Sequence, residues 1–244
     1  MGASLVSQRL EQLRPGLVAQ LFAAPEAARL PAWPGTMLRQ LSLPRLAALV
    51  HELPLAGVVP NCAQAVRSRQ LAHLAGRLCA EAALEALGGD RHAVGQDSGG
   101  APRWPAGMLG SITHDAHGAL ALVAYRHDYR WLGIDVEPVL DEPGCAAVSE
   151  VCLTAAERTQ LAASRCAAEE TTLRFSAKEA YYKAVFPQLG GDLDFLDVEL
   201  APMPAGSTRF RVLPVGRAAL RAKLPRLEGY FANDNGRVFC GIAC

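Results

Sequence analysis

The chain has 244 residues, of which 50% are hydrophobic and 20% are charged, a composition typical of a globular protein with a buried core. The formal net charge is zero, so there is no overall positive field for nucleic acid, and none is expected as a partner. No segment approaches the ~20 consecutive apolar residues of a membrane-spanning helix. The seven cysteines form no C-x-x-C pair and follow no recognisable secretory signal, which predicts a cytoplasmic protein with free thiols.

The first half of the chain predicts short elements followed by one long helix and two strands. Residues 1–60 contain several prolines, and the order of their elements is not predicted. Leucines at helical spacing predict a helix over Ala65–Leu87, which two glycines end. The Gly/Pro-rich segment Gly95–Gly107 is expected to be a loop. Strands are expected at Ala119–Tyr125 and Trp131–Glu137, joined by a short polar linker that suits a hairpin or a boundary between two halves.

The second half predicts two helices and a run of strands. Thr154 and Glu157 form a T-x-x-E capping box, the signature of a helix start. A second helix is expected over Ala167–Phe186, ended by Pro187. Short β segments follow at Phe195–Leu200, Thr208–Leu213, Gly229–Ala232 and Arg237–Ala243. The pattern predicts the α+β fold class.

Two carboxylates alternate with apolar residues in the predicted strand Trp131–Glu137. Because strand side chains alternate between faces, Asp135 and Glu137 share one face, about 6.6 Å apart. That spacing lets both carboxylates reach one hard cation, which would also relieve their mutual repulsion. A plain alternative is an exposed strand face that carries two solvated acids.

The predicted helix over Ala167–Phe186 supplies a third acid. At about 100° per residue, Glu179 falls in the same arc as the aromatic residues Phe175, Tyr182 and Phe186, which predicts partial burial. A buried carboxylate needs a partner or an ion. Lys183 stands four residues on and offers the simpler alternative, an ordinary Glu–Lys helix pair. The functional interpretation is a third metal ligand or a general base, with Lys183 beside it to hold a phosphate.

Three acids without a matching His/Cys set predict Mg²⁺, with Mn²⁺ as an alternative, because oxygen ligands suit hard cations. His114 and His117 could be considered as a zinc pair, but no cysteine stands at matching spacing and Gly118 argues against a helix there.

Basic residues recur on the long first-half helix. Arg69, His73 and Arg77 repeat every four residues, which indicates either a solvated helix face or an anchor for an anionic ligand. The segment Gly110–His114 adds small hydroxyl residues and a histidine that can donate to phosphate oxygens. No P-loop and no G-x-G-x-x-G motif occurs, so ATP or NAD binding in the usual motifs has no support.

Taken in order, these segments resemble the Sfp/EntD-type 4'-phosphopantetheinyl transferases, and the EntD-like branch most closely. The resemblance spans about residues 65 to 190, and the combination of G-I-D-V-E with F-S-A-K-E-A-x-x-K is highly specific. The segments that carry it are Arg69–Arg77, Trp104-Pro105, Gly110–His114, Gly133–Glu137, Phe175–Ala180 and Tyr182-Lys183.

The resemblance implies two similar α+β halves related by a pseudo-twofold, with residues 1–128 binding coenzyme A and 129–244 carrying the metal and catalytic carboxylates. It implies that Asp135, Glu137 and Glu179 hold Mg²⁺. Glu179 would also act as, or orient, the base for the acceptor serine, and Lys183 would neutralise the pyrophosphate.

For coenzyme A, the resemblance implies that Arg69, Arg77, Thr113 and His114 contact the 3'-phosphate end, while Asp135 and Lys183 lie at the pyrophosphate and Lys178 is a nearby candidate. Two positions depart from the family pattern: Asp115 follows His114 where a small or thiol residue is common, and Ala101 stands where a basic residue often precedes Pro102, with Arg103 as a substitute. These departures concern phosphate affinity more than the chemistry.

The activity implied is transfer of phosphopantetheine from coenzyme A to a serine of an apo acyl or peptidyl carrier protein, with release of 3',5'-ADP. The carrier would serve fatty acid, polyketide or nonribosomal peptide assembly, including siderophores, and the enzyme is expected to be a monomer. One alternative is a non-catalytic relative that binds coenzyme A or a carrier protein. Another is a hydrolase using Ser111, His114 and Asp135, although no G-x-S-x-G elbow surrounds Ser111.

Overall fold

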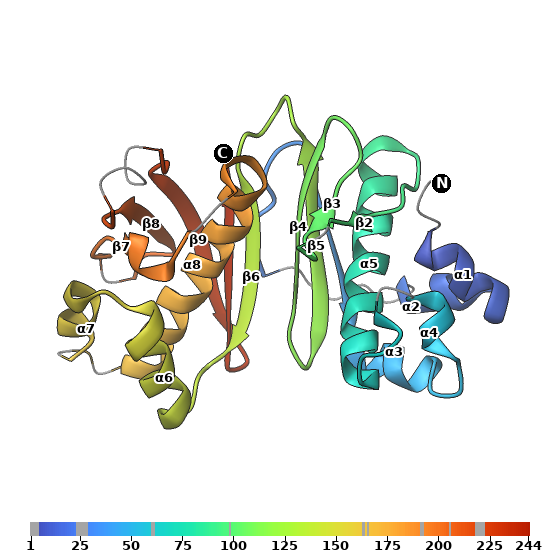
Figure 1. The fold of residues 1–244 in the computed structure, drawn as a ribbon, viewed down its shortest axis with the longest axis horizontal. Helices are drawn as coiled ribbons and strands as arrows, with labels where there is room; N and C mark the ends of the chain where they lie inside the picture. Colours follow the sequence, from blue (N-terminus) through green and yellow to red (C-terminus); the bar gives the residue numbers. More distant parts are fainter. Residues whose placement is uncertain are drawn as a thin grey trace. The chain divides into compact units, whose positions relative to one another are not determined.

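The computed structural model describes residues 5–22, 29–59, 62–97, 99–162, 164, 166–190, 193–204, 206–217 and 223–244 (Figure 1). The chain divides into two compact units, each with its own core. Unit 1 comprises Met1–Ala28 and Ala32–Tyr129, and unit 2 comprises Arg29–Pro31 and Arg130–Cys244. The division lies one residue beyond the boundary expected between residues 128 and 129. The short excursion of Arg29–Pro31 into unit 2 was not predicted.

Unit 1 packs helices against one antiparallel sheet of order β1-β5-β4. Its helices are α1 (Val6–Leu13), α2 (Leu17–Phe22), α3 (Leu43–Leu49), α4 (Leu55–Val58) and α5 (Arg67–Gly88). Its strands are β1 (Thr36–Ser42), β4 (Met108–His114) and β5 (Gly118–Tyr125), with a separate ribbon of β2 (Gly95–Gln96) and β3 (Pro102–Arg103). The predicted long helix is confirmed as α5, and the expected loop 95–107 contains this small ribbon.

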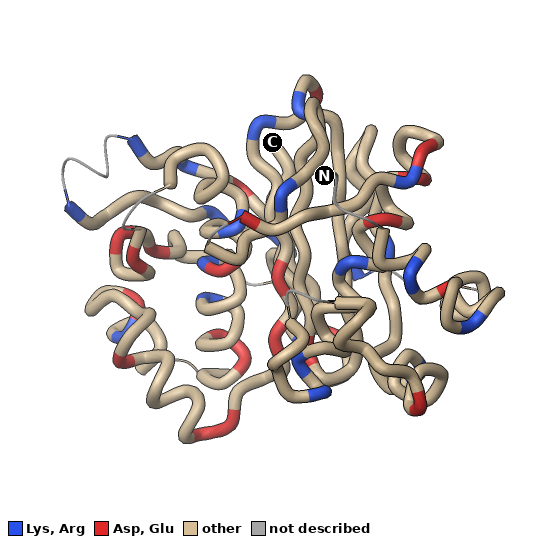
Figure 2. Tube along the Cα trace, turned by 45° about the vertical axis from the view of Figure 1, so that its right-hand side comes forward, with Lys and Arg blue, Asp and Glu red and all other residues tan. Residues whose placement is uncertain are grey.

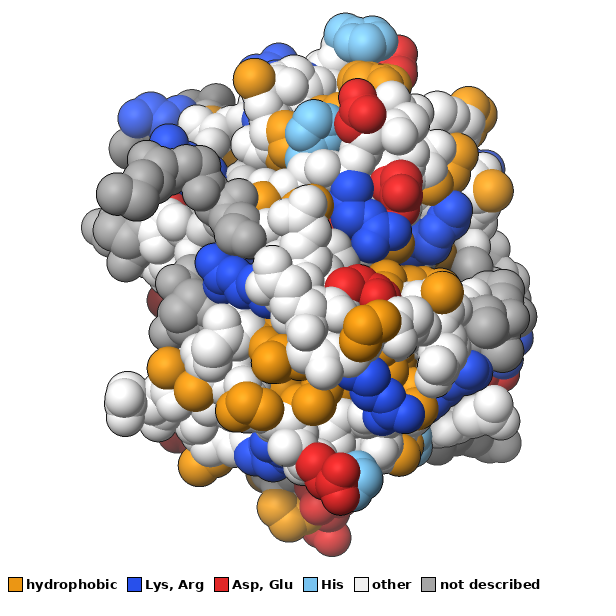
Figure 3. Space-filling view, turned by 90° about the vertical axis from the view of Figure 1, so that its right-hand side faces the viewer, with side chains coloured by type: hydrophobic (Ala, Val, Ile, Leu, Met, Phe, Trp, Pro, Cys, Tyr) orange, Lys and Arg blue, Asp and Glu red, His pale blue; other side chains and the backbone are white. Residues whose placement is uncertain are grey.

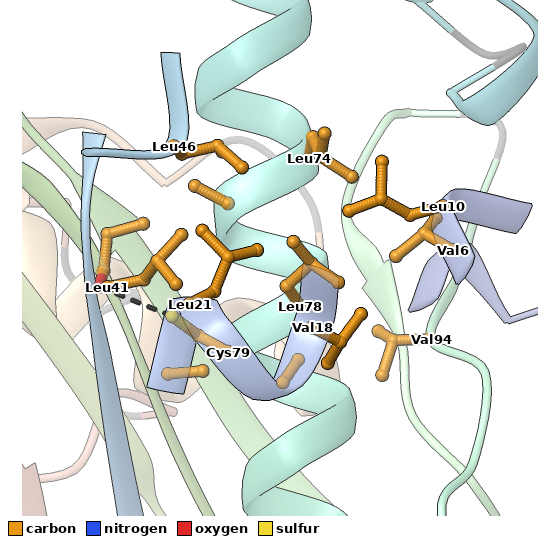
Figure 4. Close-up of a cluster of buried hydrophobic side chains, with 14 of the residues drawn as sticks. Val6, Leu10, Val18, Leu21, Leu41, Leu46, Leu74, Leu78, Cys79 and Val94 are labelled. Atoms are coloured by element: carbon orange, nitrogen blue, oxygen red, sulfur yellow. Dashed lines mark hydrogen bonds between the residues drawn. The ribbon is translucent and has the colours of Figure 1, made fainter. Parts of the chain in front are cut away.

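Helix α5 lies close on the sheet of unit 1. A Cβ atom at Gly76 would come within 2.7 Å of the Ile112 side chain, so a glycine is needed where α5 meets β4. Leucines of α5, including Leu74 and Leu78, join apolar residues of the N-terminal helices in one buried cluster (Figure 4). Cys79 is buried in this cluster and its thiol donates to the Ala119 carbonyl, 3.4 Å away.

Unit 2 packs helices against an antiparallel sheet of order β6-β10-β9-β8-β7. Its strands are β6 (Leu132–Pro138), β7 (Val198–Leu200), β8 (Arg209–Pro214), β9 (Leu227–Asp234) and β10 (Arg237–Ala243). Its helices are α6 (Glu142–Cys152), α7 (Ala155–Leu161) and α8 (Ala167–Leu189), with a short 3₁₀ turn, η2, at Phe195–Asp197. Both units thus combine helices with antiparallel sheets, which confirms the α+β class.

The capping box at Thr154 and Glu157 is confirmed as the start of α7. Helix α6 was not predicted; its N-terminus is capped by Asp141, whose side chain accepts from the Gly144 amide. The predicted end of α8 at Phe186 is wrong, because the helix continues through Pro187 to Leu189. Pro187 lies in the last turn, and the Gly190 amide still donates to the Phe186 carbonyl, so the missing proline N–H leaves the final turn intact.

Figure 2 shows acidic and basic residues interspersed along the chain, in keeping with the zero net charge. The face that carries the helices of unit 1 shows small, mixed groups of basic, acidic and hydrophobic side chains instead of one continuous basic surface (Figure 3). None of the helices in the described ranges is long and apolar enough to cross a membrane.

Gly133 in β6 allows α8 to lie directly on the sheet of unit 2. A Cβ atom there would collide with the Ala180 carbonyl and come within 2.9 Å of the Ala184 amide nitrogen. Both obstacles are helix backbone, which cannot yield without a shift of α8.

Gly133→Ala is expected to lower the free energy of unfolding by about 1–3 kcal/mol, because the added methyl overpacks the α8–β6 contact. Gly57→Ala is the matched control, since a Cβ at this exposed position in α4 meets nothing within 4 Å; it should be neutral or stabilise by up to about 1 kcal/mol. Urea unfolding of both variants measures the difference. Equal stability of Gly133→Ala and the wild type would contradict the close approach.

Candidate functional site

The face of β6 that packs on α8 carries the predicted carboxylates. Gly133, Asp135 and Glu137 alternate with Ile134 and Val136 along the strand, and Gly133 lies against α8. Asp135 is therefore turned toward the helix and is 2% exposed, whereas Glu137, nearer the strand end, is half-buried. The expectation that the two acids share a strand face agrees with this alternation, but the face is covered by a helix.

An ion pair joins the strand to the helix. The Lys183 ammonium donates to Asp135 Oδ1 at 2.6 Å. The Lys183 side chain is 27% exposed and the Asp135 side chain 3%, so the pair has one buried and one accessible member. Lys183 therefore pairs with the strand acid Asp135, and its charge also acts on Glu179, one helical turn earlier.

Glu179 lies one helical turn before Lys183 and is half-buried. Burial raises the pKa of the Glu179 carboxyl, the Lys183 ammonium lowers it, and the negative charge of Asp135 raises it further. The two carboxylates and the ammonium therefore interact in one small region between β6 and α8. A raised pKa means that added positive charge at this place would favour the ionised carboxylate.

The burial of Glu179 has a different origin from the one predicted. The aromatic arc of Phe175, Tyr182 and Phe186 is only half-buried, and the last two rings stack on each other with centroids 5.0 Å apart. The core-facing side of α8 instead carries small residues and the fully buried Tyr181. The aromatic arc does not face the core because the close α8–β6 approach requires small residues such as Ala180 and Ala184 on the side of the helix that meets the sheet.

Within the described ranges, no three His, Cys, Asp or Glu side chains converge on a common metal position. Asp135 is instead engaged by Lys183. The donor set nevertheless suits a hard cation: Asp135, Glu137 and Glu179 offer only carboxylate oxygens, and the electrostatic strain between Asp135 and Glu179 is what a bound divalent ion would relieve. These residues fit Mg²⁺ better than zinc.

Lys178, which the resemblance made a candidate contact for coenzyme A, is held inside unit 2. Its side chain is fully buried, and the ammonium donates to the Cys152 carbonyl at 2.8 Å, to Glu157 Oε2 at 2.7 Å and to the Phe195 carbonyl at 3.0 Å. An ammonium has three donors, and all three are used inside unit 2. These three bonds leave the Lys178 ammonium no free donor for a phosphate oxygen, although the side chain also lines a pocket beside Glu179.

Glu157 completes a buried polar hub around Lys178. Glu157 is itself fully buried, and its carboxylate also accepts from the Thr154 amide at 3.0 Å and from the Leu200 amide at 2.9 Å. The hub ties the end of α6, the start of α7, η2 and β7 to α8 immediately beside Glu179. Lys178 thus supports the position of Glu179 from the helix interior.

A pocket of about 290 Å³ lies beside Glu179 in unit 2. Most of its exposed lining is apolar and aromatic, with Tyr182 from α8 and Leu193, Phe195 and Val198 from the segment that follows the helix. Lys178 and Asp194 also line it. Sequence reasoning missed this pocket. Its far wall lies beyond the helix end, and only the folded chain brings that wall back to Glu179.

A second pocket, of about 250 Å³, lies in unit 1 and is lined by two arginine and two histidine side chains. Arg69, His73 and Arg77 reach it from one side of α5, and His114 reaches it from β4. The predicted stripe on α5 is therefore not simply a solvated face. Arg69 is exposed, but Arg77 is 6% exposed and its Nη1 atom has no hydrogen-bond partner among the described residues.

Burial and the surrounding charges shift the pKa values of Arg77 and His73 in this pocket. Burial lowers the pKa of Arg77 to about 10, opposed by Cys62 and Glu81, so the guanidinium stays charged at neutral pH. Burial lowers the pKa of His73 to about 4, and the positive charges of Arg77, His114 and Arg69 lower it as well. The pocket therefore carries fixed positive charge and a neutral imidazole.

Thr113 is not among the residues that line this pocket. It is buried, and along β4 it alternates with Ile112 and His114, which face α5, so its side chain lies on the opposite face of the sheet. Ser111 shares the face of Thr113 and is likewise turned away from His114. The proposed Ser111–His114 pair of a hydrolase is therefore not formed.

The departure at Asp115 has a local explanation. The Asp115 carboxylate accepts from the His117 amide at 2.8 Å and the Gly118 amide at 2.9 Å, so it closes the turn between β4 and β5. It does not line the unit 1 pocket. In the preceding loop Pro102 and Gln96 line the pocket, whereas Arg103 does not take the place of the missing basic residue.

Comparison with known proteins gives matches over both units. Residues 57–124 match the 4'-phosphopantetheinyl transferase N-terminal domain, and residues 132–227 match the 4'-phosphopantetheinyl transferase superfamily. The 4'-phosphopantetheinyl transferase Svp of Streptomyces mobaraensis is 37% identical over 185 residues, 75% of each chain. PptT of Mycobacterium tuberculosis is 34% identical over 78% of this chain and 85% of its own. Enterobactin synthase component D of Salmonella typhimurium is 33% identical over 69% and 70%.

The Lys178–Glu157 hub predicts a stability effect. Lys178→Met should lower the free energy of unfolding by about 3–5 kcal/mol, because it leaves the Glu157 carboxylate buried without its counter-charge. The double variant Lys178→Met with Glu157→Leu should lose less, since no charge then remains buried. Urea unfolding in a double-mutant cycle measures the coupling, with the exposed Lys223→Met as control. Unchanged stability of Lys178→Met, together with weaker coenzyme A binding, would contradict the hub.

Proposed function

Because this chain belongs to the 4'-phosphopantetheinyl transferase superfamily, we propose that the carboxylates of β6 and α8 form its catalytic centre and that the pocket of unit 1 binds the phosphate end of coenzyme A. The activity of the family is transfer of 4'-phosphopantetheine from coenzyme A to a carrier protein, and the chain is an enzyme of this type. The observation that carries the assignment of the catalytic centre is the convergence of Asp135, Glu179 and Lys183 where α8 lies on β6.

In the reaction, the acceptor serine Oγ attacks the β-phosphorus of coenzyme A. A new P–O bond to serine forms as the bond between that phosphorus and the bridging pyrophosphate oxygen breaks. The serine proton must be removed, and 3',5'-ADP leaves with the electron pair of the broken bond. The protein must therefore supply charge compensation for the pyrophosphate, a proton acceptor, and fixed positions for both substrates.

Asp135, Glu137 and Glu179 would hold Mg²⁺, with Mn²⁺ as an alternative. When bound, such an ion neutralises pyrophosphate charge and stabilises the departing phosphate. The all-carboxylate donor set supports this assignment. So does the raised pKa of Glu179, which burial causes first and repulsion by Asp135 increases.

Glu179 accepts or orients the serine proton. A general base must come within hydrogen-bond reach of that proton, directly or through one water. Glu179 is half-buried and lines the pocket next to α8, so its carboxylate is accessible from that side. Lys183, part exposed and already paired with Asp135, contributes positive charge for the pyrophosphate oxygens.

The apolar pocket beside Glu179 receives the pantetheine arm of coenzyme A. Its aromatic and aliphatic lining, from Tyr182, Leu193, Phe195 and Val198, suits an uncharged, flexible chain. The Arg69 and Arg77 side chains of unit 1 bind the 3'-phosphate, because the buried Arg77 guanidinium has an Nη1 atom that no described residue engages and is a strong site for a phosphate oxygen.

The acceptor is an apo acyl or peptidyl carrier domain. The relationship to enterobactin synthase component D supports a siderophore or nonribosomal peptide pathway, with polyketide and fatty acid carriers as alternatives. A cytoplasmic monomer remains our prediction. The rival function is that of a non-catalytic relative that binds coenzyme A or a carrier protein. Such a protein would share the binding features of a transferase but would not transfer the phosphopantetheine group.

Intact-mass measurement of an apo carrier protein, incubated with this enzyme, coenzyme A and Mg²⁺, tests the proposed function. We expect a mass gain of one phosphopantetheine group, abolished by EDTA. Glu179→Gln, which keeps the side-chain shape but removes its charge, should slow the gain by at least about 100-fold, as expected for loss of a general base. Glu150→Gln on exposed α6 is the matched control. Coenzyme A binding without a mass gain on any carrier type would favour the non-catalytic relative.

Arg77→Gln is expected to raise KM for coenzyme A by about 10- to 100-fold, the loss of one charge-assisted hydrogen bond to phosphate. kcat should change little, because the 3'-phosphate is remote from the reacting phosphorus. Dephospho-coenzyme A, which lacks that phosphate, should show nearly the same KM with the variant and the wild type. Steady-state kinetics with both substrates measure this, with exposed Arg126→Gln as control. An equal KM increase for both substrates would place Arg77 elsewhere.

A further inference from the structure

His73 lies in the middle of the basic lining of the unit 1 pocket. It is one helical turn from Arg69 and one from Arg77 on α5, and all three side chains line the same cavity. From β4, His114 reaches the cavity, and from the segment before α5 the Cys62 thiol does so. None of the described residues that line the cavity carries a carboxylate. Among the described residues that line the cavity, the charged or titratable groups beside His73 are therefore the two arginines, His114 and Cys62.

This setting keeps the His73 imidazole neutral while the pocket holds no anion. Burial, followed by repulsion from Arg77, His114 and Arg69, lowers the pKa of His73 to about 4. The imidazole is thus deprotonated at neutral pH, although it sits where a phosphate group would need donors. The buried Nη1 atom of Arg77, for which no described residue is a hydrogen-bond partner, marks the place where an oxygen of the ligand would be received.

A phosphate dianion bound in the pocket raises the pKa of His73. The anion offsets the positive charges that disfavour the imidazolium, and it accepts a hydrogen bond from it. Burial then disfavours the imidazolium less, because the charge is paired with the phosphate and is no longer isolated.

Resting on the proposed function of this pocket, we propose that His73 takes up a proton from solvent when the 3'-phosphate of coenzyme A binds, and so becomes a third charged contact beside Arg69 and Arg77. The proton is released again when 3',5'-ADP leaves, so the transfer reaction itself is unchanged. His73 thereby adds selectivity for coenzyme A over its 3'-dephosphorylated form. It acts on substrate binding and not on the reacting phosphorus.

The sign of the pH dependence follows from linkage. The complex holds one more proton than the separate protein and ligand, so affinity rises as pH falls. This dependence, up to about tenfold per pH unit, applies between the pKa of His73 in the free protein, about 4, and its higher pKa in the complex. Above the pKa in the complex, the contribution of His73 to affinity fades. The affinity of His73→Gln should lack this dependence but still change with the titration of the ligand phosphate. The ratio of the wild-type affinity to the variant affinity at each pH therefore isolates the contribution of His73.

Isothermal titration calorimetry with 3',5'-ADP measures the proton directly. Binding enthalpies are recorded at pH 6.5 and 7.5, each in buffers of different ionisation enthalpy, and their slope gives the number of protons taken up. We expect net uptake by the wild-type protein, greater at pH 6.5, and a marked loss of uptake in His73→Gln with weaker binding. Exposed His117→Gln is the matched control and should behave as the wild type. Dephospho-coenzyme A should bind without uptake.

Several outcomes would overturn the inference. Uptake that is unchanged in His73→Gln would assign the proton to His114 or to the ligand, and absence of uptake by the wild type would exclude coupling. Failure of 3',5'-ADP to bind the wild-type protein would remove the pocket assignment together with the inference, even if carrier modification is intact. Conversely, binding without coupling would leave the proposed function standing and remove only the role of His73.

A measurement without any substitution guards against a variant that fails to fold. The ¹⁵N shifts of the His73 imidazole in the wild-type protein distinguish neutral from protonated rings. We expect a neutral ring in the free protein at pH 7 and imidazolium shifts with saturating 3',5'-ADP. A ring that stays neutral in the complex at pH 6.5 would contradict the proposal.

Discussion

Helix α8 can lie directly on strand β6 because position 133 carries no side chain, and Ala180 and Ala184 of the helix are small as well. This contact sets the distance across which Lys183 reaches Asp135. It also places Glu179, one turn earlier on the same helix, within electrostatic reach of that carboxylate. A helix held farther from the sheet would separate the two acids, and neither the ion pair nor a shared cation could form between them.

The two units carry local excesses of opposite charge. Unit 2 concentrates carboxylates that repel one another and are partly compensated by Lys183, so it gains from added positive charge. The pocket of unit 1 concentrates guanidinium and imidazole groups at the cost of a depressed pKa for His73, so it gains from added negative charge. A zero net charge for the whole chain hides these two local excesses. The buried hub of Lys178 and Glu157, by contrast, is satisfied within the protein.

Much of the fold class and part of the site could be predicted from sequence. Period-2 alternation around Asp135, the four-residue repeat of Arg69, His73 and Arg77, and the capping box at Thr154 all depend on local geometry, which sequence spacing specifies. The order of elements in residues 1–60 and helix α6 were not predicted, because their stability comes from packing and from the Asp141 cap more than from periodic hydrophobicity.

The errors share a physical cause. Lys178 and Glu179 are adjacent in sequence and both line the pocket, yet on a helix neighbouring positions point about 100° apart, so only the Lys178 ammonium is bonded within the buried hub. The side chains of Thr113 and His114 lie on opposite faces of the sheet, because successive side chains alternate along a strand. The pocket beside Glu179 needs Leu193–Val198 folded back onto α8, a long-range arrangement that no local spacing records.

The most direct test of the catalytic assignment is a crystal structure of the protein with Mn²⁺ and coenzyme A, in which the anomalous signal of manganese locates the ion independently of side-chain positions. The account predicts an anomalous peak at ligand distance from carboxylate oxygens of Asp135 and Glu179, with Glu137 as the further ligand and a pyrophosphate oxygen beside it. A peak held by other residues, or bound coenzyme A with no ion near these carboxylates, would contradict it.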